Sequence, residues 1–196
     1  SLASAPYGAQ VRATATVSAL VGAPSGSVEF LVDGAVVGSS AVASGTAISD
    51  LPLLSVGVHT IGARYAGSRD HLVSFDEVTG FAITRALPDV TLAVSPNPTL
   101  AGTPVSFEVE VVGVQGNPTG NVKLLVDGAQ VDAQTLGSTG RIVYTSTLSS
   151  GTFQISAEYE GDGNFAPRSS APITLTVNAA PPALTIISNL PKGIMG

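Results

Sequence analysis

The sequence predicts an all-β protein built from two β-sandwiches in tandem, and three observations lead to this fold class. A ten-residue stretch occurs twice, as GSVEFLVDGA at residues 26–35 and as GNVKLLVDGA at residues 120–129, an offset of 94 residues. The segments between turns alternate apolar and polar residues, as half-buried strands do. No segment sustains the 3.6-residue period of a helix, and seven or so short strands in a repeat of this length are typical of a sandwich.

The repeat extends over most of the chain. The same offset carries residues 63–67 (ARYAG) onto residues 157–161 (AEYEG), Gly57 onto Gly151 and Gly8 onto Gly102, with no gap needed between these anchors. A fixed period of this length indicates two domains. We place them at residues 1–86, with the first strand missing, and at residues 87–179, joined by a short linker that contains proline.

The strands are expected in the same order in both repeats. The first alternation faces the core with Val11, Ala13, Ala15 and Val17, or with Val105, Phe107, Val109 and Val111. The repeated stretch is the next strand, and its Asp-Gly predicts a tight hairpin. Further strands are expected at residues 36–42, 46–54, 131–136 and 141–148, and long strands begin at Gly57 and Gly151. The expected core residues of these and the last strands are Val28, Phe30, Val32, Ile61, Ala63, Tyr65, Phe81 and Ile83, with Val122, Leu124, Val126, Ile155, Ala157, Tyr159, Leu175 and Val177 at the same offset or in the same pattern.

The two ends of the chain fit the repeat unequally. The first repeat has no counterpart of the strand expected at residues 90–94, whereas residues 184–187 (LTII) match residues 90–93 (VTLA). We therefore expect residues 180–196 to be a linker and the first strand of a following repeat, in a slice of a longer array. The alternative is that this strand enters a second molecule, as in donor-strand complementation, and builds a head-to-tail assembly.

The composition excludes several classes of function. Lys and Arg total eight in 196 residues and the formal net charge is −6, which argues against electrostatic binding of nucleic acid or of an anionic membrane surface. The chain has no cysteine, so disulfides, thiolate metal sites and cysteine nucleophiles are excluded. No apolar run reaches the 18 residues of a membrane span.

Three features in this order resemble a known family. They are the strand G-x-V-x-F/L-x-V-D-G, the strand G-x-H/F-x-I-x-A-x-Y and the following turn GDGNF at residues 161–165. Together they resemble the bacterial immunoglobulin-like repeats that occur in tandem on large surface and secreted proteins. The first repeat departs from the pattern at residues 67–71 (GSRDH). The resemblance implies stalk, adhesin or accessory-module roles and brings no catalytic residues and no cofactor.

The candidate chemical groups favour structural roles. His59 and His71 fall on Phe153 and Phe165 at the repeat offset, and a position that accepts His or Phe is expected to be a packing position. Asp33 and Asp127 precede glycine and are expected to adopt positive φ in their turns. Tyr65 and Tyr159 close their strands and are expected to anchor the sandwich edge, since the chain has no tryptophan for a sugar-binding platform.

One loop carries weak candidates for a cation site. Asp162, Asn164 and Glu160 lie close together in sequence and offer the oxygen ligands that Ca²⁺ prefers. Their spacing does not match an EF-hand, and the first repeat keeps only Asp70 nearby. An ordinary turn without a metal is the expected reading.

The sequence therefore predicts a structural tandem without chemistry of its own, from a bacterial cell-surface or secreted protein. Its partners would be neighbouring repeats in the same chain, with head-to-tail self-assembly and an unidentified host or surface ligand as further partners. The alternative function is an accessory module that binds carbohydrate, a receptor or a Ca²⁺-dependent ligand through residues 67–74 or 161–167. An enzyme whose catalytic domain lies elsewhere is the remaining alternative.

Overall fold

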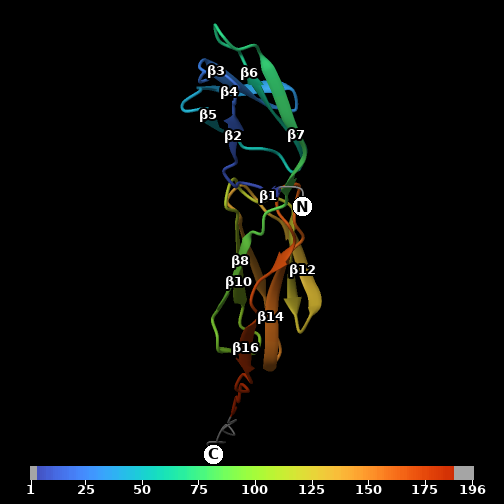
Figure 1. The fold of residues 1–196 in the computed structure, drawn as a ribbon. Coiled ribbons are helices and arrows are strands. Elements are labelled where there is room, and N and C mark those ends of the chain that lie inside the picture. Colours follow the sequence, from blue (N-terminus) through green and yellow to red (C-terminus); the bar gives the residue numbers. More distant parts are fainter. Residues whose placement is uncertain (1–3, 188–196) are drawn as a thin grey trace, which may run out of the picture.

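The chain forms two β-sandwiches stacked end to end in a computed structural model that describes residues 4–187 (Figure 1). The described residues form strands, turns and irregular segments, so the predicted all-β class is confirmed. Within them there is no helix long and apolar enough to cross a membrane.

The N-terminal sandwich contains the first seven strands. They are β1 (Ser4–Pro6), β2 (Arg12–Thr16), β3 (Ser27–Val32), β4 (Ala35–Ala41), β5 (Thr46–Asp50), β6 (Gly57–Tyr65) and β7 (Ser74–Thr84). One sheet has the order β1-β7-β6-β3-β4, and the opposite sheet consists of β2 and β5 alone. The short β1 runs parallel to β7, and the other pairs are antiparallel.

The C-terminal sandwich repeats this plan with an additional strand. Its elements are β8 (Asp89–Ser95), β9 (Thr99–Leu100), β10 (Val105–Val112), β11 (Asn121–Val126), β12 (Ala129–Thr135), β13 (Arg141–Ser146), β14 (Gly151–Tyr159), β15 (Arg168–Ser169) and β16 (Ile173–Asn178). One sheet follows the order β12-β11-β14-β16-β9, with β15 beside β14, and the other is β13-β10-β8. The strand β8 has no counterpart beside β2 among residues 4–187.

The cores form where the alternation predicted them. Val28 and Phe30 of β3 are each 1% exposed, and Val122 and Leu124 of β11 are 0% and 1% exposed. The tyrosine that ends the long strand is also buried in both domains. The remaining predicted positions of the second repeat are buried except for the half-buried Val126, whereas several in the first are only half-buried, namely Val11, Ala13, Ala15, Val17, Ile61, Ala63 and Phe81.

The constant offset of 94 residues between the two repeats is wrong in one place. Phe107 of β10 faces Tyr144 of β13, whereas its counterpart Ala13 of β2 faces Ser49 of β5, an offset of 95 rather than 94. The turn before β5 is one residue shorter than the turn before β13: Gly45 and Gly140 accept equivalent hydrogen bonds from Val17 and Val111. The offset returns to 94 at the next long strand, so the two differences cancel in the sequence comparison.

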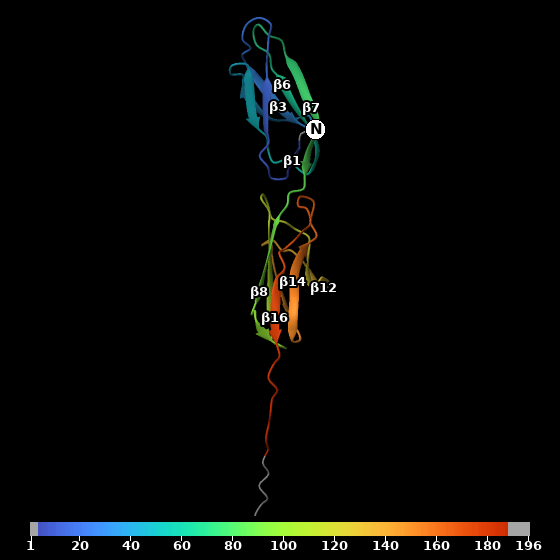
Figure 2. The ribbon, with the colours of Figure 1, turned by 60° about the horizontal axis from the view of Figure 1, so that its bottom comes forward.

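The predicted strand at residues 184–187 is not observed. These residues belong to no strand, and Leu184, Ile186 and Ile187 are 80% or more exposed. Figure 2 shows this segment running away from the C-terminal sandwich, on the side opposite to the N-terminal domain. The rest of the proposed linker and strand, residues 188–196, lies outside the described residues.

The core of the C-terminal domain yields a stability prediction. Phe107 is 1% exposed and faces Tyr144 across the strand pair, so replacing it with Ala leaves a cavity. We expect Phe107→Ala to lower the free energy of unfolding of this domain by roughly 2–5 kcal/mol, in calorimetry or denaturant titration. The N-terminal domain, which has Ala13 at this position, provides the internal control. An unchanged C-terminal transition would contradict the predicted core.

Candidate functional site

The two sandwiches share an apolar joint. Tyr7, which follows β1, meets Phe165 of the 161–167 loop edge to face, with ring centroids 5.7 Å apart and planes at 87°. Phe165 is 1% exposed, and Tyr7 packs against the cores of both domains. Ala86 of the linker, 2% exposed, belongs to the same C-terminal core. The joint is therefore a continuation of the two cores.

Backbone hydrogen bonds fix the linker to the C-terminal domain. The Ala86 N–H donates to the carbonyl of Asn164, and the Ala166 N–H donates to the carbonyl of Ala86, both at 2.9 Å. The Arg168 guanidinium donates to the Pro88 carbonyl at 2.7 Å. Two ladder bonds and a charge-assisted bond hold the linker as a short added strand.

Glycine at position 8 permits close approach of the domains at this joint. Its φ is +85°, a region that glycine adopts readily. A Cβ at this position would lie 2.8 Å from the Cβ of Gln115, in the loop that follows β10. A larger residue would push the two domains apart.

Asp162 shapes the loop that presents Phe165. One carboxylate oxygen accepts the N–H groups of Asn164 and Phe165, at 2.7 and 2.8 Å. The other accepts the N–H and the hydroxyl of Thr119, at 2.8 and 2.9 Å. Partial burial acts to raise the pKa of Asp162, but these donors outweigh it and hold the pKa below its usual value. The carboxylate thus fixes the loop geometry.

The other two candidate cation ligands have different partners. The Glu160 carboxylate pairs with the ammonium of Lys123, and the Asn164 carbonyl accepts the hydrogen bond from the linker. Within residues 4–187, no three acidic or histidine side chains lie close enough together to hold a metal ion. The loop that the sequence offered as a cation site is thus packed into the joint.

Asp33 and Asp127 occupy equivalent hairpin turns. Their φ values are 52° and 50°, and the glycines that follow them also have positive φ, as a type I′ turn requires. This prediction is confirmed, and each carboxylate has a further role. Asp33 accepts the N–H of Thr60 at 2.9 Å and Asp127 that of Gln154 at 2.8 Å, which ties each turn to the neighbouring long strand.

His59 is buried, as its packing role predicted, but packing is not its whole role. Its Nδ1 lies 2.8 Å from a carboxylate oxygen of Asp33, and its Nε2 lies 2.9 Å from the Ser55 carbonyl. Both partners accept, so only the doubly protonated ring satisfies both. The Asp33 carboxylate, followed by the Ser55 carbonyl, raises the pKa of His59. Phe153 cannot make such bonds. The alignment of His59 with Phe153 at the repeat offset therefore indicated a packing role and did not reveal the hydrogen bonds of His59.

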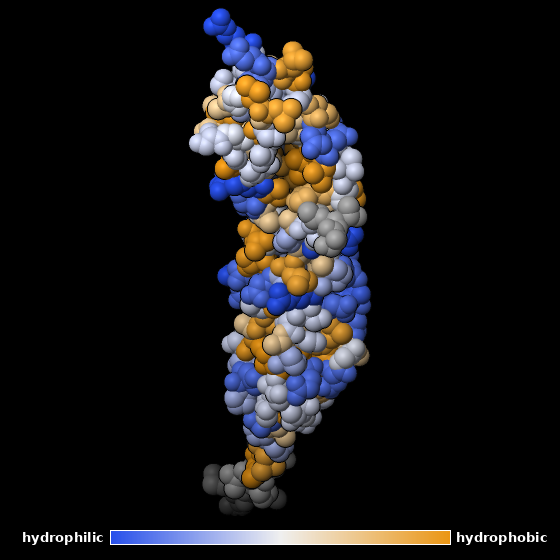
Figure 3. Space-filling view, viewed as in Figure 1, coloured by the Kyte–Doolittle hydropathy of each residue, from blue (hydrophilic) through white to orange (hydrophobic). Residues whose placement is uncertain are grey.

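The outer tip of the N-terminal domain carries His71. Its Nε2 lies 3.1 Å from the Val21 carbonyl and its Nδ1 lies 3.0 Å from the Ser68 hydroxyl, which links two tip loops. Leu20 and Leu72 of these loops are almost fully exposed. Figure 3 shows apolar surface at this tip. His71 and Phe165 are thus equivalent, but one joins two loops and the other fills the joint.

The tyrosines that close the long strands are buried. Tyr65 is 4% exposed and its hydroxyl donates to the Ser25 carbonyl at 2.5 Å, while Tyr159 is 0% exposed. Burial raises the pKa of Tyr159. Both side chains lie inside the sandwich, as expected of edge anchors.

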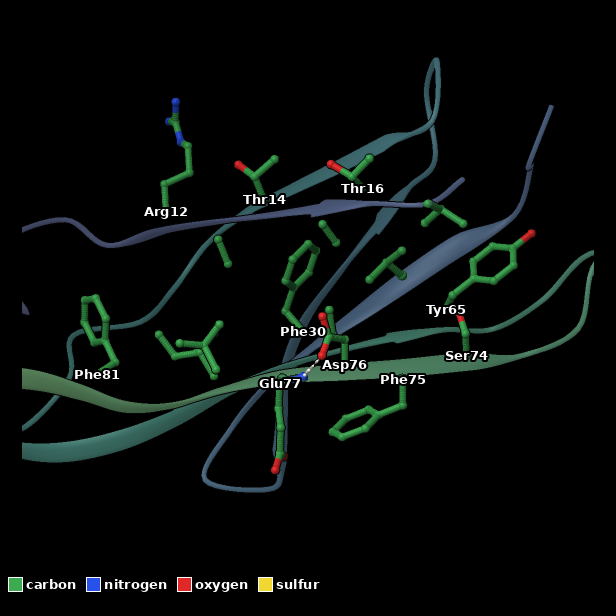
Figure 4. A pocket seen from close by; sticks show the side chains of 18 of the residues that line it. Arg12, Thr14, Thr16, Phe30, Tyr65, Ser74, Phe75, Asp76, Glu77 and Phe81 are labelled. Atoms are coloured by element: carbon green, nitrogen blue, oxygen red, sulfur yellow. Dashed lines mark hydrogen bonds between the residues drawn. The ribbon is translucent and has the colours of Figure 1, made fainter. Parts of the chain in front are cut away.

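A groove of about 600 Å³ opens in the N-terminal domain between β2 and β7 (Figure 4). The floor includes Phe30 and Tyr65. Ser74 and Asp76 of β7 point toward the groove, whereas Phe75 points away from it. Among the described residues, the missing counterpart of residues 90–94 leaves one sheet of this domain without a strand. The depth of the groove depends in addition on the size of the side chains that line it, and the alternation of apolar and polar residues does not report on side-chain size.

The His59 geometry predicts a pH dependence. A pKa raised above about 6.5 stabilises the fold fully below that pH and loses this contribution as the pH rises through the folded pKa. We therefore expect the melting temperature of the N-terminal domain to fall between pH 6 and pH 9. Calorimetry of the whole chain measures both domains together.

His59→Phe is the matched variant, because the C-terminal domain has Phe153 at this position. This change should remove most of the fall, and the C-terminal transition should lack it in both proteins. A fall of equal size in His59→Phe would show that other groups cause it.

The comparison with protein families agrees with this architecture. The family described as "Bacterial Ig-like domain (group 3)" matches residues 1–82 and 92–178. No curated protein matches the chain. Among solved structures, it is similar to the fibronectin(III)-like modules of Clostridium thermocellum CbhA, with 20% identity, a TM-score of 0.40, and coverage of 96% of this chain and 95% of that one.

Two further structures are similar at lower identity. The amphioxus IgVJ-C2 molecule has 13% identity and a TM-score of 0.43, with 88% of this chain and 99% of that chain covered. Dimeric latent PorU from Porphyromonas gingivalis has 13% identity and a TM-score of 0.37, with coverage of 92% and 19%. The family match covers most of both sandwiches, and the chain belongs to the bacterial Ig-like domains of group 3, a family typical of surface and secreted proteins.

Proposed function

We propose that this chain is a stiff spacer in a bacterial cell-surface or secreted protein, with no chemistry of its own. The observation that carries this proposal is the joint, where Tyr7, Ala86 and Phe165 join two cores into one apolar layer. Domains joined only by a flexible tether lack such a layer and reorient freely. A packed joint keeps them aligned, which suits a stalk that holds a distal part away from a surface.

The alignment also sets a useful length. Strands of about nine residues at about 3.3 Å each, with their loops, make each sandwich about 40 Å long. Two aligned sandwiches therefore span about 80 Å. We propose an extracellular or cell-surface location, in which neighbouring repeats of the same chain are the immediate partners.

A second candidate function is a binding module, and the outer tip favours it. Leu20, Val21, Leu72 and Val73 are each more than 70% exposed there, and contiguous exposed apolar surface marks contact sites. Binding on a glycan array, or a Ca²⁺-dependent shift in melting temperature, would favour this role over the spacer.

The spacer proposal predicts that Tyr7→Ala loosens the joint while leaving both sandwiches folded. Tyr7 is half-buried between the domains, so its loss removes the edge-to-face contact and part of the shared apolar surface. NMR relaxation should show the wild-type domains tumbling as one body and the Tyr7→Ala domains tumbling separately. Small-angle scattering should show a wider distribution of lengths in the variant.

Phe75→Ala is the matched control, because Phe75 is 56% exposed and points away from the groove (Figure 4). It lies at the start of β7, and the other end of that strand leads into the linker. This variant should leave the tumbling unchanged. Independent tumbling of the two domains in the wild-type chain would rule out a stiff spacer.

A further inference from the structure

The N-terminal domain contributes a side chain to the core of its neighbour. Tyr7 follows β1, which lies at the end of the N-terminal sandwich that meets the C-terminal one (Figures 1 and 2). Its N–H donates to the carbonyl of Thr84 at 2.8 Å, so the pair of β1 and β7 holds it in place. Its side chain packs against the cores of both domains. The position of Tyr7 on the C-terminal core therefore depends on the folding of the N-terminal domain.

Phe165 is the corresponding contribution of the C-terminal domain. A Cβ at position 113 would lie 2.4 Å from Cζ of Phe165, so the ring rests on the backbone of Gly113 in its own domain. The same ring meets Tyr7 edge to face, and Phe165 is 1% exposed. Unfolding of the N-terminal domain would bring part of this ring into water, and unfolding of the C-terminal domain would do the same to Tyr7. Exposing apolar surface costs free energy in proportion to its area.

Two glycine turns bring the loops of the two domains together beside the rings. Gly8 approaches Gln115 so closely that an added Cβ would lie 2.8 Å from the Cβ of that residue. A Cβ on Gly116, whose φ is +74°, would lie 3.9 Å from the hydroxyl oxygen of Tyr7. Contacts this close require both turns to keep their native conformation, because dispersion attraction falls steeply with separation.

We infer that the joint couples the folding of the two domains, so that each folded domain stabilises the other. A domain that opens beside a folded neighbour must also break the joint, whereas a domain whose neighbour has already unfolded has no joint to break. Linkage makes the effect reciprocal, so the joint adds the same free energy to the stability of either domain. A loss of structure in one domain therefore makes the other domain easier to unfold.

This coupling involves the joint on which the proposed spacer rests, but it goes beyond alignment. A spacer requires only that the domains keep their relative orientation, and a contact can fix an orientation without adding much stability. Coupling requires that the contact contributes to the free energy of unfolding. The tumbling of the domains measures the first property, and the stability of each domain measures the second.

Hydrogen exchange of backbone amides, followed by NMR in the whole chain, measures the stability of each domain separately. Amides of β6 report on the N-terminal domain and amides of β14 on the C-terminal domain, because each of these strands has hydrogen-bonded neighbours on both sides. The diagnostic result is a change of exchange in the domain that does not carry the substitution.

Glycines at equivalent positions provide a matched pair of variants. Gly8→Ala and Gly102→Ala add a methyl group at similar φ values, +85° and +81°, and both strain their own domain. Only the first methyl group meets the neighbouring domain, whereas nothing lies within 4 Å of a Cβ on Gly102. Gly8→Ala should therefore speed the exchange of β14 by about tenfold, as expected for the loss of an aromatic contact and its buried area. Gly102→Ala should leave the exchange of β6 unchanged.

Two phenylalanines of the C-terminal core provide a second pair. Phe165→Leu removes the edge-to-face contact with Tyr7 but keeps an apolar side chain. Phe107→Leu makes the same change at an equally buried residue, nearer the end of β10 that lies away from Gly113. Both variants should speed the exchange of β14. Only Phe165→Leu should also speed the exchange of β6, by about tenfold.

An unchanged rate of β14 in Gly8→Ala, or of β6 in Phe165→Leu, would refute the coupling. The same holds if either control variant changes the neighbouring domain as strongly as its counterpart, because the effect would then not pass through the joint. Wild-type domains that tumble together, with unchanged exchange in these variants, would leave the spacer standing without the coupling. Wild-type domains that tumble separately, with the expected changes in exchange, would rule out the stiff spacer and support the coupling.

Discussion

Each sheet of a sandwich must have its inner face covered by the apolar side chains of the opposite sheet, because leaving that face in water forfeits the main stabilising term of the fold. The C-terminal domain meets this requirement fully, with Val105, Phe107, Val109 and Val111 of β10 all 2% exposed or less. The N-terminal domain meets it only in part. The inner face of β2 is only half-buried because it lines the groove, where no strand of the described residues covers it.

The same requirement operates at the ends of the sandwiches. The end of a sandwich exposes core residues between its turns, and the joint covers one such end with Tyr7 and Ala86. Asp162 contributes indirectly, by holding the loop in the shape that turns Phe165 toward the linker. The corresponding loop of the N-terminal domain has no domain above it among the described residues, and its apolar side chains remain exposed.

Strand order and core positions could be predicted from the sequence, because alternation and the repeat offset report directly on which face each residue occupies. Two features could not. The shifted register of β5 is hidden because one missing residue in its turn is compensated before β6. The contact between His59 and Asp33 joins residues that are 26 positions apart, and it becomes visible only once β3 and β6 are aligned through their pairing.

The joint was also missed, for a similar reason. Tyr7 lies outside every repeated motif and falls on Ala101 at the offset, so nothing in the repeat marks it. The available signal was the contrast itself, an aromatic residue at a position where the other repeat has alanine. Phe165 was correctly assigned to packing, but the sequence did not indicate that its packing partner belongs to the neighbouring domain.

The parallel pairing of β1 with β7 has a mechanical consequence. The chain enters the N-terminal sandwich through β1 and leaves it through β7, and the two strands are hydrogen-bonded side by side in the same direction. In the C-terminal sandwich β9 also runs parallel to β16, but the chain enters that domain through β8. A pull along the axis of the molecule therefore slides β1 and β7 past each other, so the hydrogen bonds of this pair bear the load together instead of opening one by one.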